Sequence, residues 1–184
     1  ESSGVALLQN LKIDCQRVCD PVFLLEPEEW SKLALEKKYD DDYILVYAFY
    51  GQKEIYEFAR KLADTRNCKV YAVGTKGTNR FYDVDKYFWS VSPNEFVNLI
   101  RNSKAVVTNS FHGLAFSLIY NKDLYAFKTD KRGNSRIIDL LKAIGNYKEN
   151  NNSLIAEIND YTEINRRLTE LKEYSKKYLK DCGI

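Results

Sequence analysis

Several scarcities narrow what this chain can be. It contains no methionine, a single histidine, and no apolar run near the roughly 18 residues that a membrane span requires. No basic stretch followed by an apolar one marks a signal peptide at its start. Because the chain opens with Glu1 and lacks methionine, we expect it to be a fragment or a processed form of a longer protein. We also expect that it does not cross a membrane.

Cysteine and net charge are equally sparse. A zinc site would require paired C-x2-C or Cys/His clusters, whereas this chain offers one C-x3-C and one distant histidine, so we expect no metal site. The four cysteines are too few for a disulfide scaffold and are expected to be buried thiols: Cys15, Cys19, Cys68 and Cys182. The net charge of +2 predicts no general attraction to nucleic acid, so any anion site must be local.

The rest of the sequence alternates between strand and helix signals. This alternation predicts one α/β domain over residues 1–184, with a Rossmann-like, doubly wound parallel sheet. Expected strands are Gln16–Cys19, Tyr43–Phe49, Lys69–Val73, Tyr87–Trp89, Ala105–Val107 and Leu124–Phe127. Expected helices end near Ile13, begin at Pro27, Ile55 and Pro93, and cover Phe111–Tyr120, Ser135–Ile144 and 160–180.

The order of the strands predicts where a ligand would bind. Counted from Tyr43, right-handed connections would place the strands in the order 3-2-1-4-5. The order reverses between strands one and four, and such sheets bind ligands at the carboxyl ends of the strands at that point. The first of these strands ends in Tyr50 and Gly51, and the fourth in the segment Thr108–Gly113.

The segment at the end of the fourth strand suits an anionic ligand. Thr108, Asn109 and Ser110 carry side-chain donors, and the helix that begins at Phe111 points its positive dipole end at the same edge. Gly113 permits close approach of a backbone or a ligand, and His112 belongs to the residue type that exchanges protons near neutral pH. Two structural alternatives remain open: Asn109 and Ser110 could serve only as a helix cap, and the histidine could be structural.

A basic cluster follows the fifth strand. Ser135 and Arg136 begin a helix, where backbone N–H groups and a guanidinium could together hold a phosphate or carboxylate. Lys128, Lys131 and Arg132 precede them. The alternative is an ordinary solvated basic loop.

Four segments resemble the polysaccharide pyruvyl transferase family. They are Asp20–Leu25 with Trp30, Pro93–Phe96, Val107–Ser117, and Ser135–Leu141. The Ser-Phe-His-Gly sequence, followed by an apolar helix, is the most specific of them. One departure stands out, because some members have arginine and leucine where this chain has Ser110 and Phe111. Either Arg136, Lys131 or a group on the missing lobe supplies the positive charge, or the donor is a different one.

The resemblance implies a fold, a reaction and a division of labour. It implies the C-terminal lobe of a GT-B-like, two-lobed enzyme whose N-terminal lobe, with its glycine-rich segment, is missing, so the chain alone would be inactive. Family members move the enolpyruvyl unit of phosphoenolpyruvate onto a sugar hydroxyl and form a pyruvate ketal on a glycan precursor, without a further cofactor. The family pattern makes His112 the catalytic or ligand-contacting residue and Arg136 a candidate anion contact. With the residues placed at the carboxyl edge and in the basic cluster by the arguments above, the candidate binding residues are Thr108, Asn109, Ser110, Phe111, Gly113, Ser135, Arg136, Tyr50 and Gly51.

The resemblance also implies a location and leaves two competing functions. The protein would act in the cytoplasm or at the inner face of the membrane, during exopolysaccharide and cell-envelope synthesis. Its partners would be phosphoenolpyruvate, a sugar acceptor and the missing lobe, with no nucleic acid. The alternatives are a GT-B glycosyltransferase lobe that binds a nucleotide-sugar, and a binding module without catalysis.

Overall fold

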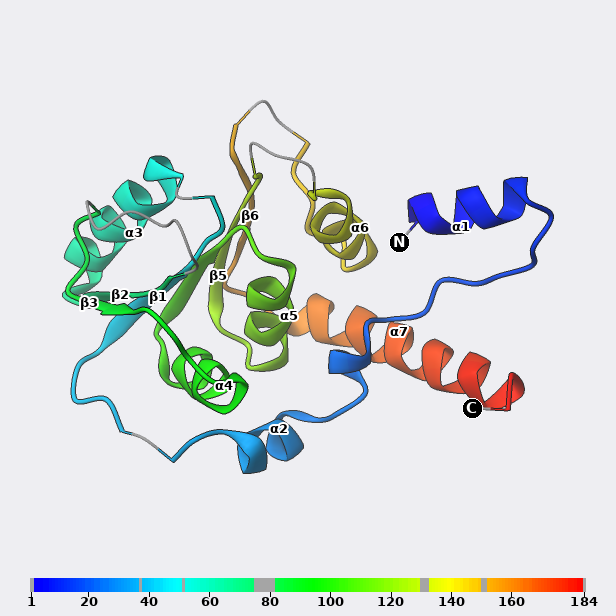
Figure 1. Ribbon diagram of the computed structural model, residues 1–184, viewed down its shortest axis with the longest axis horizontal. Helices are drawn as coiled ribbons and strands as arrows, with labels where there is room; N and C mark the ends of the chain where they lie inside the picture. Colours follow the sequence, from blue (N-terminus) through cyan, green and yellow to red (C-terminus); the bar gives the residue numbers. More distant parts are fainter. Residues whose placement is uncertain are drawn as a thin grey trace.

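The computed structural model describes residues 2–36, 38–50, 52–74, 82–129, 133–149 and 152–183. These residues form a layered α/β domain around a six-stranded sheet (Figure 1). The strands are β1 (Tyr43–Tyr47), β2 (Lys69–Val73), β3 (Lys86–Phe88), β4 (Ala105–Thr108), β5 (Asp123–Phe127) and β6 (Leu154–Ile158). The helices are α1 (Ser2–Asn10), η1 (Pro21–Phe23), α2 (Pro27–Leu33), α3 (Lys53–Arg66), α4 (Pro93–Asn102), α5 (Phe111–Ile119), α6 (Ser135–Ala143) and α7 (Thr162–Asp181).

The strand order is β3-β2-β1-β4-β5-β6, which confirms the predicted arrangement of the first five strands. β1 lies at the centre and pairs in parallel with β2 and β4, with Tyr47 opposite Thr108. These strands are buried on both faces, which explains their continuous apolar sequences. The sheet order therefore reverses between β1 and β4, as the sequence predicted.

β6 was not predicted. It runs antiparallel to β5 and makes the sheet mixed rather than wholly parallel. The prediction of a strand at Gln16–Cys19 is wrong, because that segment lies along α7 and the Cys19 backbone N–H donates to the Ser175 hydroxyl at 2.8 Å. β6 forms the edge of the sheet beside β5.

The two faces of the sheet are covered unequally. α3 packs on one face, whereas α4 and α5 pack on the other (Figure 1). α5 is apolar almost all round, and its residues from Gly113 to Ile119 are buried, as predicted from its sequence. The buried α5 is therefore a rigid support for the side chains at its amino end.

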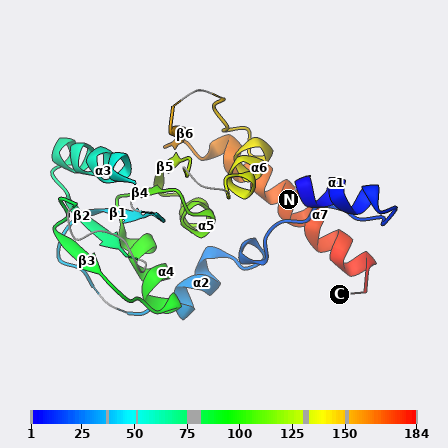
Figure 2. The same ribbon diagram turned by 45° about the horizontal axis from the view of Figure 1, so that its top comes forward.

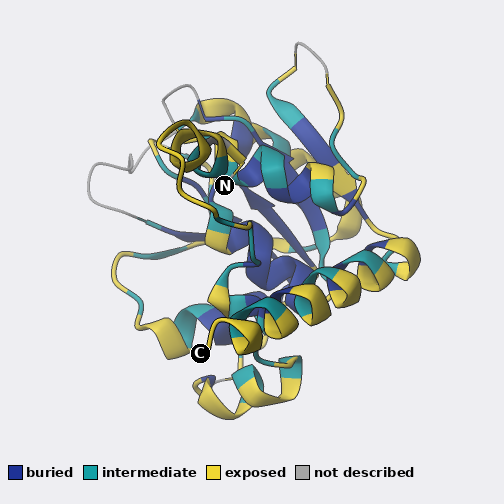
Figure 3. Cartoon of the chain, turned by 90° about the vertical axis from the view of Figure 1, so that its right-hand side faces the viewer, coloured by how far each residue is buried: buried dark blue, intermediate teal, exposed yellow. Residues whose placement is uncertain are grey.

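The beginning and the end of the chain meet beside this core. α7 runs along one side of the molecule, and its outward-facing residues are largely exposed (Figure 3). α1 lies apart from the sheet (Figure 2), and at its start the Ser2 backbone N–H donates to Asp139 of α6 at 2.7 Å. Every helix in the described ranges is too short or too polar to span a lipid bilayer.

Candidate functional site

Asn109 joins the carboxyl ends of the two central strands. Its Oδ1 accepts the Phe49 backbone N–H at 2.8 Å, and its Nδ2 donates to the Phe49 carbonyl at 3.0 Å. Nδ2 also donates to Gln52 Oε1 at 2.6 Å, and the residue is only 4% exposed. The side chain proposed from sequence as a ligand donor thus holds the turn that follows β1.

Thr108 and Ser110 support the start of α5. Thr108 Oγ1 donates to the Tyr47 carbonyl at 2.6 Å and accepts the Ser110 backbone N–H at 3.0 Å. Ser110 is the N-cap, and its hydroxyl accepts the Gly113 backbone N–H at 3.5 Å. Both side chains are buried, so the structural reading of Ser110 as a helix cap is confirmed.

Gly113 is required by packing between α5 and β4. A Cβ at this position would lie 2.3 Å from Thr108 Oγ1, far inside contact distance. The close approach that sequence analysis assigned to a backbone or a ligand is made by the Thr108 side chain.

Tyr47 lies beneath this network. Burial raises the pKa of its phenol, although hydrogen bonding with Ser110 lowers it. The raised pKa keeps the phenol protonated at neutral pH. Tyr47 therefore packs beside the start of α5 as a neutral hydrogen-bonding partner of Ser110.

His112 and Tyr50 are exposed where β1 and β4 end at this edge. His112 lies in the first turn of α5, with its ring centroid 5.6 Å from that of Phe111. Tyr50, in the turn after β1, is 58% exposed and has a left-handed backbone φ of 65°. Gly51 lies outside the described residues. The edge therefore presents an imidazole and a phenol above a buried polar network.

Arg136 comes to the same region from the amino end of α6. Its Nη2 lies 2.8 Å from Asp20 Oδ2, and its guanidinium carbon lies 4.0 Å from the Phe111 ring centroid. Sequence analysis proposed Arg136 as an anion contact but did not foresee its pairing with Asp20. Asp20 also accepts the Val22 backbone N–H at 3.1 Å and so caps η1.

The other members of the basic cluster are less informative. Ser135 is the exposed first residue of α6. Lys128 is half-buried, and its backbone N–H donates to the Ser153 carbonyl at 2.7 Å. Lys131 and Arg132 lie outside the described residues. The contribution of this loop to the site thus rests on Arg136.

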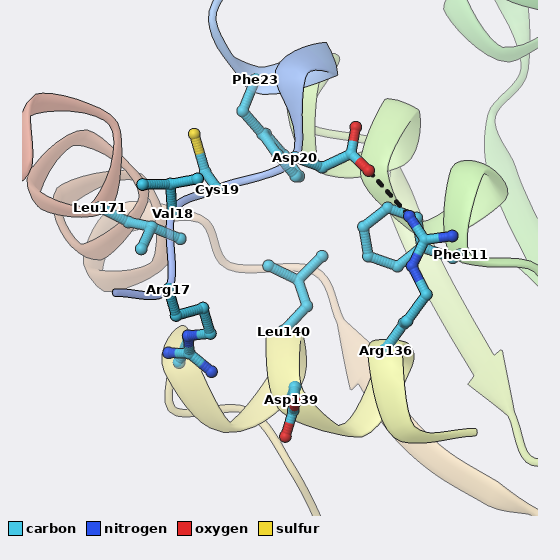
Figure 4. A pocket seen from close by; sticks show the side chains of 11 residues that line it. Arg17, Val18, Cys19, Asp20, Phe23, Phe111, Arg136, Asp139, Leu140 and Leu171 are labelled. Carbon is cyan, nitrogen blue, oxygen red and sulfur yellow. Dashed lines mark hydrogen bonds and ion pairs between the residues drawn. The ribbon is translucent and has the colours of Figure 1, made fainter. Parts of the chain in front are cut away.

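A cavity of about 150 Å³ opens beside the Asp20–Arg136 pair (Figure 4). Two further charged residues line it: Arg17 before η1, and Asp139 on α6. Its apolar wall includes Phe23, Phe111, Leu140 and Leu171. Sequence analysis missed Arg17 and Asp139, although Asp139 lies in the segment that carries the family resemblance.

The segments that resemble the family are in contact in the folded chain. Trp30 packs edge-on against Phe116, with centroids 4.9 Å apart, and its Nε1 donates to the Val22 carbonyl at 2.9 Å. Phe96 packs against Phe116 from α4, at 5.9 Å. Together with the Asp20–Arg136 pair, these contacts unite all four segments around α5. Their residue types are explained largely by mutual packing.

The cysteines form no disulfide, and the expectation that all are buried is wrong. Cys19 is buried, Cys15 and Cys68 are half-buried, and Cys182 is exposed on the last turn of the chain. Within the described ranges, no three His, Cys, Asp or Glu side chains gather as metal ligands would.

Comparison with known proteins supports the family resemblance for three of its four segments, because Ser135–Leu141 lies beyond the matched region. The family model for polysaccharide pyruvyl transferase matches residues 1–131, which include β1–β5 and the segment Thr108–Gly113. No curated protein and no solved structure matches the chain. Because the match covers well over half of the sequence, the chain belongs to the polysaccharide pyruvyl transferase family.

Proposed function

We propose that this chain supplies the His112 half of an active site that transfers the enolpyruvyl unit of phosphoenolpyruvate to a sugar. The observation that carries the proposal is the position of His112. It is exposed on the first turn of a buried, capped helix, at the edge where the strand order reverses. Ligands of doubly wound sheets bind at that edge.

The reaction has a simple proton balance. One sugar hydroxyl adds to C2 of phosphoenolpyruvate while the methylene carbon gains a proton and becomes a methyl group. Phosphate then leaves, and a second hydroxyl of the same sugar takes its place at C2, which gives the ketal. Two hydroxyl protons are lost by the sugar, one balanced by the methyl group and one by hydrogen phosphate.

His112 is proposed to deliver the proton to the methylene carbon. Imidazole is the side chain best suited to proton transfer near neutral pH. A solvent-facing place on a rigid helix also allows it to reach a ligand without rearrangement of the core.

Arg136 is proposed to attract the phosphate or carboxylate of the donor. A guanidinium can bind an anion through two parallel hydrogen bonds, and the dipole of α6 adds to the attraction at its amino end. Asp20 orients the guanidinium through Nη2. Asp20 also offsets the charge, so the donor must compete with a carboxylate that is already in place.

The wider enzyme is part of the same proposal. The chain would be the second lobe of a GT-B-like protein, and the base for the sugar hydroxyl would come from the other lobe. It would act without a cofactor, in the cytoplasm or at the inner face of the membrane, because phosphoenolpyruvate is made inside cells.

Ligand titration tests the proposal. Calorimetry of the chain should give heat with phosphoenolpyruvate and none with UDP-glucose or GDP-mannose at equal concentration. In the active protein, phosphate release from phosphoenolpyruvate should require a glycan acceptor. Binding of a nucleotide-sugar instead would support a glycosyltransferase lobe, and binding of neither would support a module without catalysis.

A further inference from the structure

The turn after β1 is held in a conformation that its sequence does not favour. Tyr50 has φ = 65°, in the left-handed region where a residue with a Cβ is strained. Asn109 makes three hydrogen bonds to Phe49 and Gln52, which lie before and after Tyr50 in the chain. Strained residues that are held from several sides are concentrated at functional sites.

This turn lies beside the first turn of α5. Tyr47 and Thr108 are direct neighbours in the sheet, so the chain after each strand leaves the same edge. Asn109, which contacts Phe49, is three residues before His112. Tyr50 and His112 therefore border one stretch of the carboxyl edge.

The exposure of the Tyr50 ring is unusual for its surroundings. Phe49 packs against Tyr47 with centroids 5.3 Å apart and touches the Tyr50 ring with centroids 6.3 Å apart, yet Tyr50 as a residue remains 58% exposed. Pyranose rings have an apolar face of C–H groups. Flat aromatic side chains can stack on such faces and lose little conformational entropy, because they have few rotatable bonds.

We infer that Tyr50 binds the acceptor by stacking on a pyranose ring of the glycan, and that Asn109 is the positioning residue that holds it there. This inference rests on the proposed function, because it assigns the sugar half of that site. Donor and acceptor would then meet between the Arg136 side of α5 and the turn after β1, with His112 next to both.

The first experiment measures sugar binding without catalysis. Saturation-transfer NMR is recorded on the chain with methyl glycosides of glucose, galactose, mannose and N-acetylglucosamine, and phosphoenolpyruvate binding is followed in parallel. We expect Tyr50→Ala to weaken glycoside binding roughly threefold to tenfold, the range for loss of one aromatic contact. Phosphoenolpyruvate binding should stay unchanged.

Tyr174→Ala is the matched control, since Tyr174 is an exposed tyrosine on α7, far along the chain from the site. It should leave glycoside binding intact. Equal binding by the wild type and Tyr50→Ala would overturn the inference, as would a wild-type chain that binds phosphoenolpyruvate but no glycoside. Failure of phosphoenolpyruvate to bind at all would count against the proposed function instead.

The second experiment concerns Asn109. Asn109→Asp keeps the acceptor for the Phe49 N–H but removes both donated bonds, and Gln52→Ala removes only one. In the active protein we expect the acceptor KM to rise severalfold in both variants, more in Asn109→Asp, while the donor KM is unchanged. A purely structural role would lower the Tm and leave the ratio of the two KM values at its wild-type level, which would overturn the assignment.

Discussion

The two edges of the sheet use polar residues in opposite ways. At the amino edge, opposite charges neutralise each other near the surface: Arg66 lies 2.6 Å from Asp123, and Lys104 lies 3.2 Å from Asp42. At the carboxyl edge, buried neutral groups such as Thr108 and Asn109 bond to the backbone of the neighbouring strand.

The two edges differ in how strongly their polar groups hold the backbone in place. Exposed ion pairs contribute little to stability, because solvent and salt screen them. Buried hydrogen-bonded groups are costly to disrupt, because a partner left unsatisfied pays its full desolvation penalty. The carboxyl edge is therefore rigid beneath its surface and can present His112 and Tyr50 to a ligand.

The largest effect should follow loss of His112. In the active protein, His112→Ala should lower kcat by about a hundredfold or more, since a general acid contributes about that much. The Tm should stay near the wild-type value because the side chain is exposed. Lys104→Ala, at the opposite edge, should leave kcat unchanged, and parallel loss of Tm and activity in His112→Ala would indicate a structural histidine.

Arg136 should come next. Calorimetry should show phosphoenolpyruvate affinity weakened about tenfold to a hundredfold in Arg136→Ala, as expected for a charge-assisted bond of about 1.5–3 kcal/mol. Asp20→Asn removes the competing charge but also an oxygen that orients the guanidinium, so it should change the donor affinity far less than Arg136→Ala does. Unchanged affinity in Arg136→Ala would make the pair purely structural.

Gly113→Ala tests the rigidity beneath the site. The added methyl group must displace Thr108 or shift α5, which should cost roughly 1–3 kcal/mol of unfolding free energy. Chemical denaturation measures this cost, and it should be the same at pH 5 and pH 8. Gly133→Ala is no suitable control, because its φ of 133° strains any side chain; Gly4, which has open space around it, is suitable.

The smallest effect concerns Asp85, at the amino edge. Burial alone would raise the pKa of its carboxyl. The hydrogen bonds from the Val70 N–H and Arg60 lower that pKa by more than burial raises it, so the net shift is downward. A carboxyl with a lowered folded pKa stabilises above its unfolded pKa of about 3.9 and loses that contribution as pH falls through the folded value. Asp85→Asn should cost up to about 1 kcal/mol at pH 7, and the difference from wild type should shrink below about pH 4. A difference that is constant with pH would contradict this.

Short-range patterns predicted the central sheet and the edge at which its strand order reverses. The apolar runs of β1 and β4 and the helix cap at Ser110 are local features, so the sequence displays them directly. Contacts between residues far apart in the chain could not be predicted from the sequence. The segment Gln16–Cys19, which was expected to be a strand, lies along α7, where the Cys19 N–H bonds to Ser175. The same holds for Asp20 and Arg136, which are 116 positions apart.

The sequence also did not predict which of two neighbouring residues is buried and which is exposed. Asn109 and His112 both follow β4, yet one is buried against Phe49 and the other is exposed. Which of the two side chains is buried depends on the backbone path between the end of β4 and the start of α5. The spacing of apolar residues in the sequence does not reveal that path. β6 was missed for a related reason, since an alternating pattern of strands and helices does not require a short antiparallel strand at the edge.

The antiparallel β6 determines how far the chain can be truncated from its C-terminal end. The family match stops at residue 131, but Ile155 and Ile158 of β6 are 0% and 2% exposed, and Leu168 of α7 is 6% exposed. A chain truncated at the end of the match would uncover the backbone edge of β5 and the apolar surface under α7. Open strand edges recruit other chains, so such a truncation should aggregate even though the whole region matched by the family model remains in it.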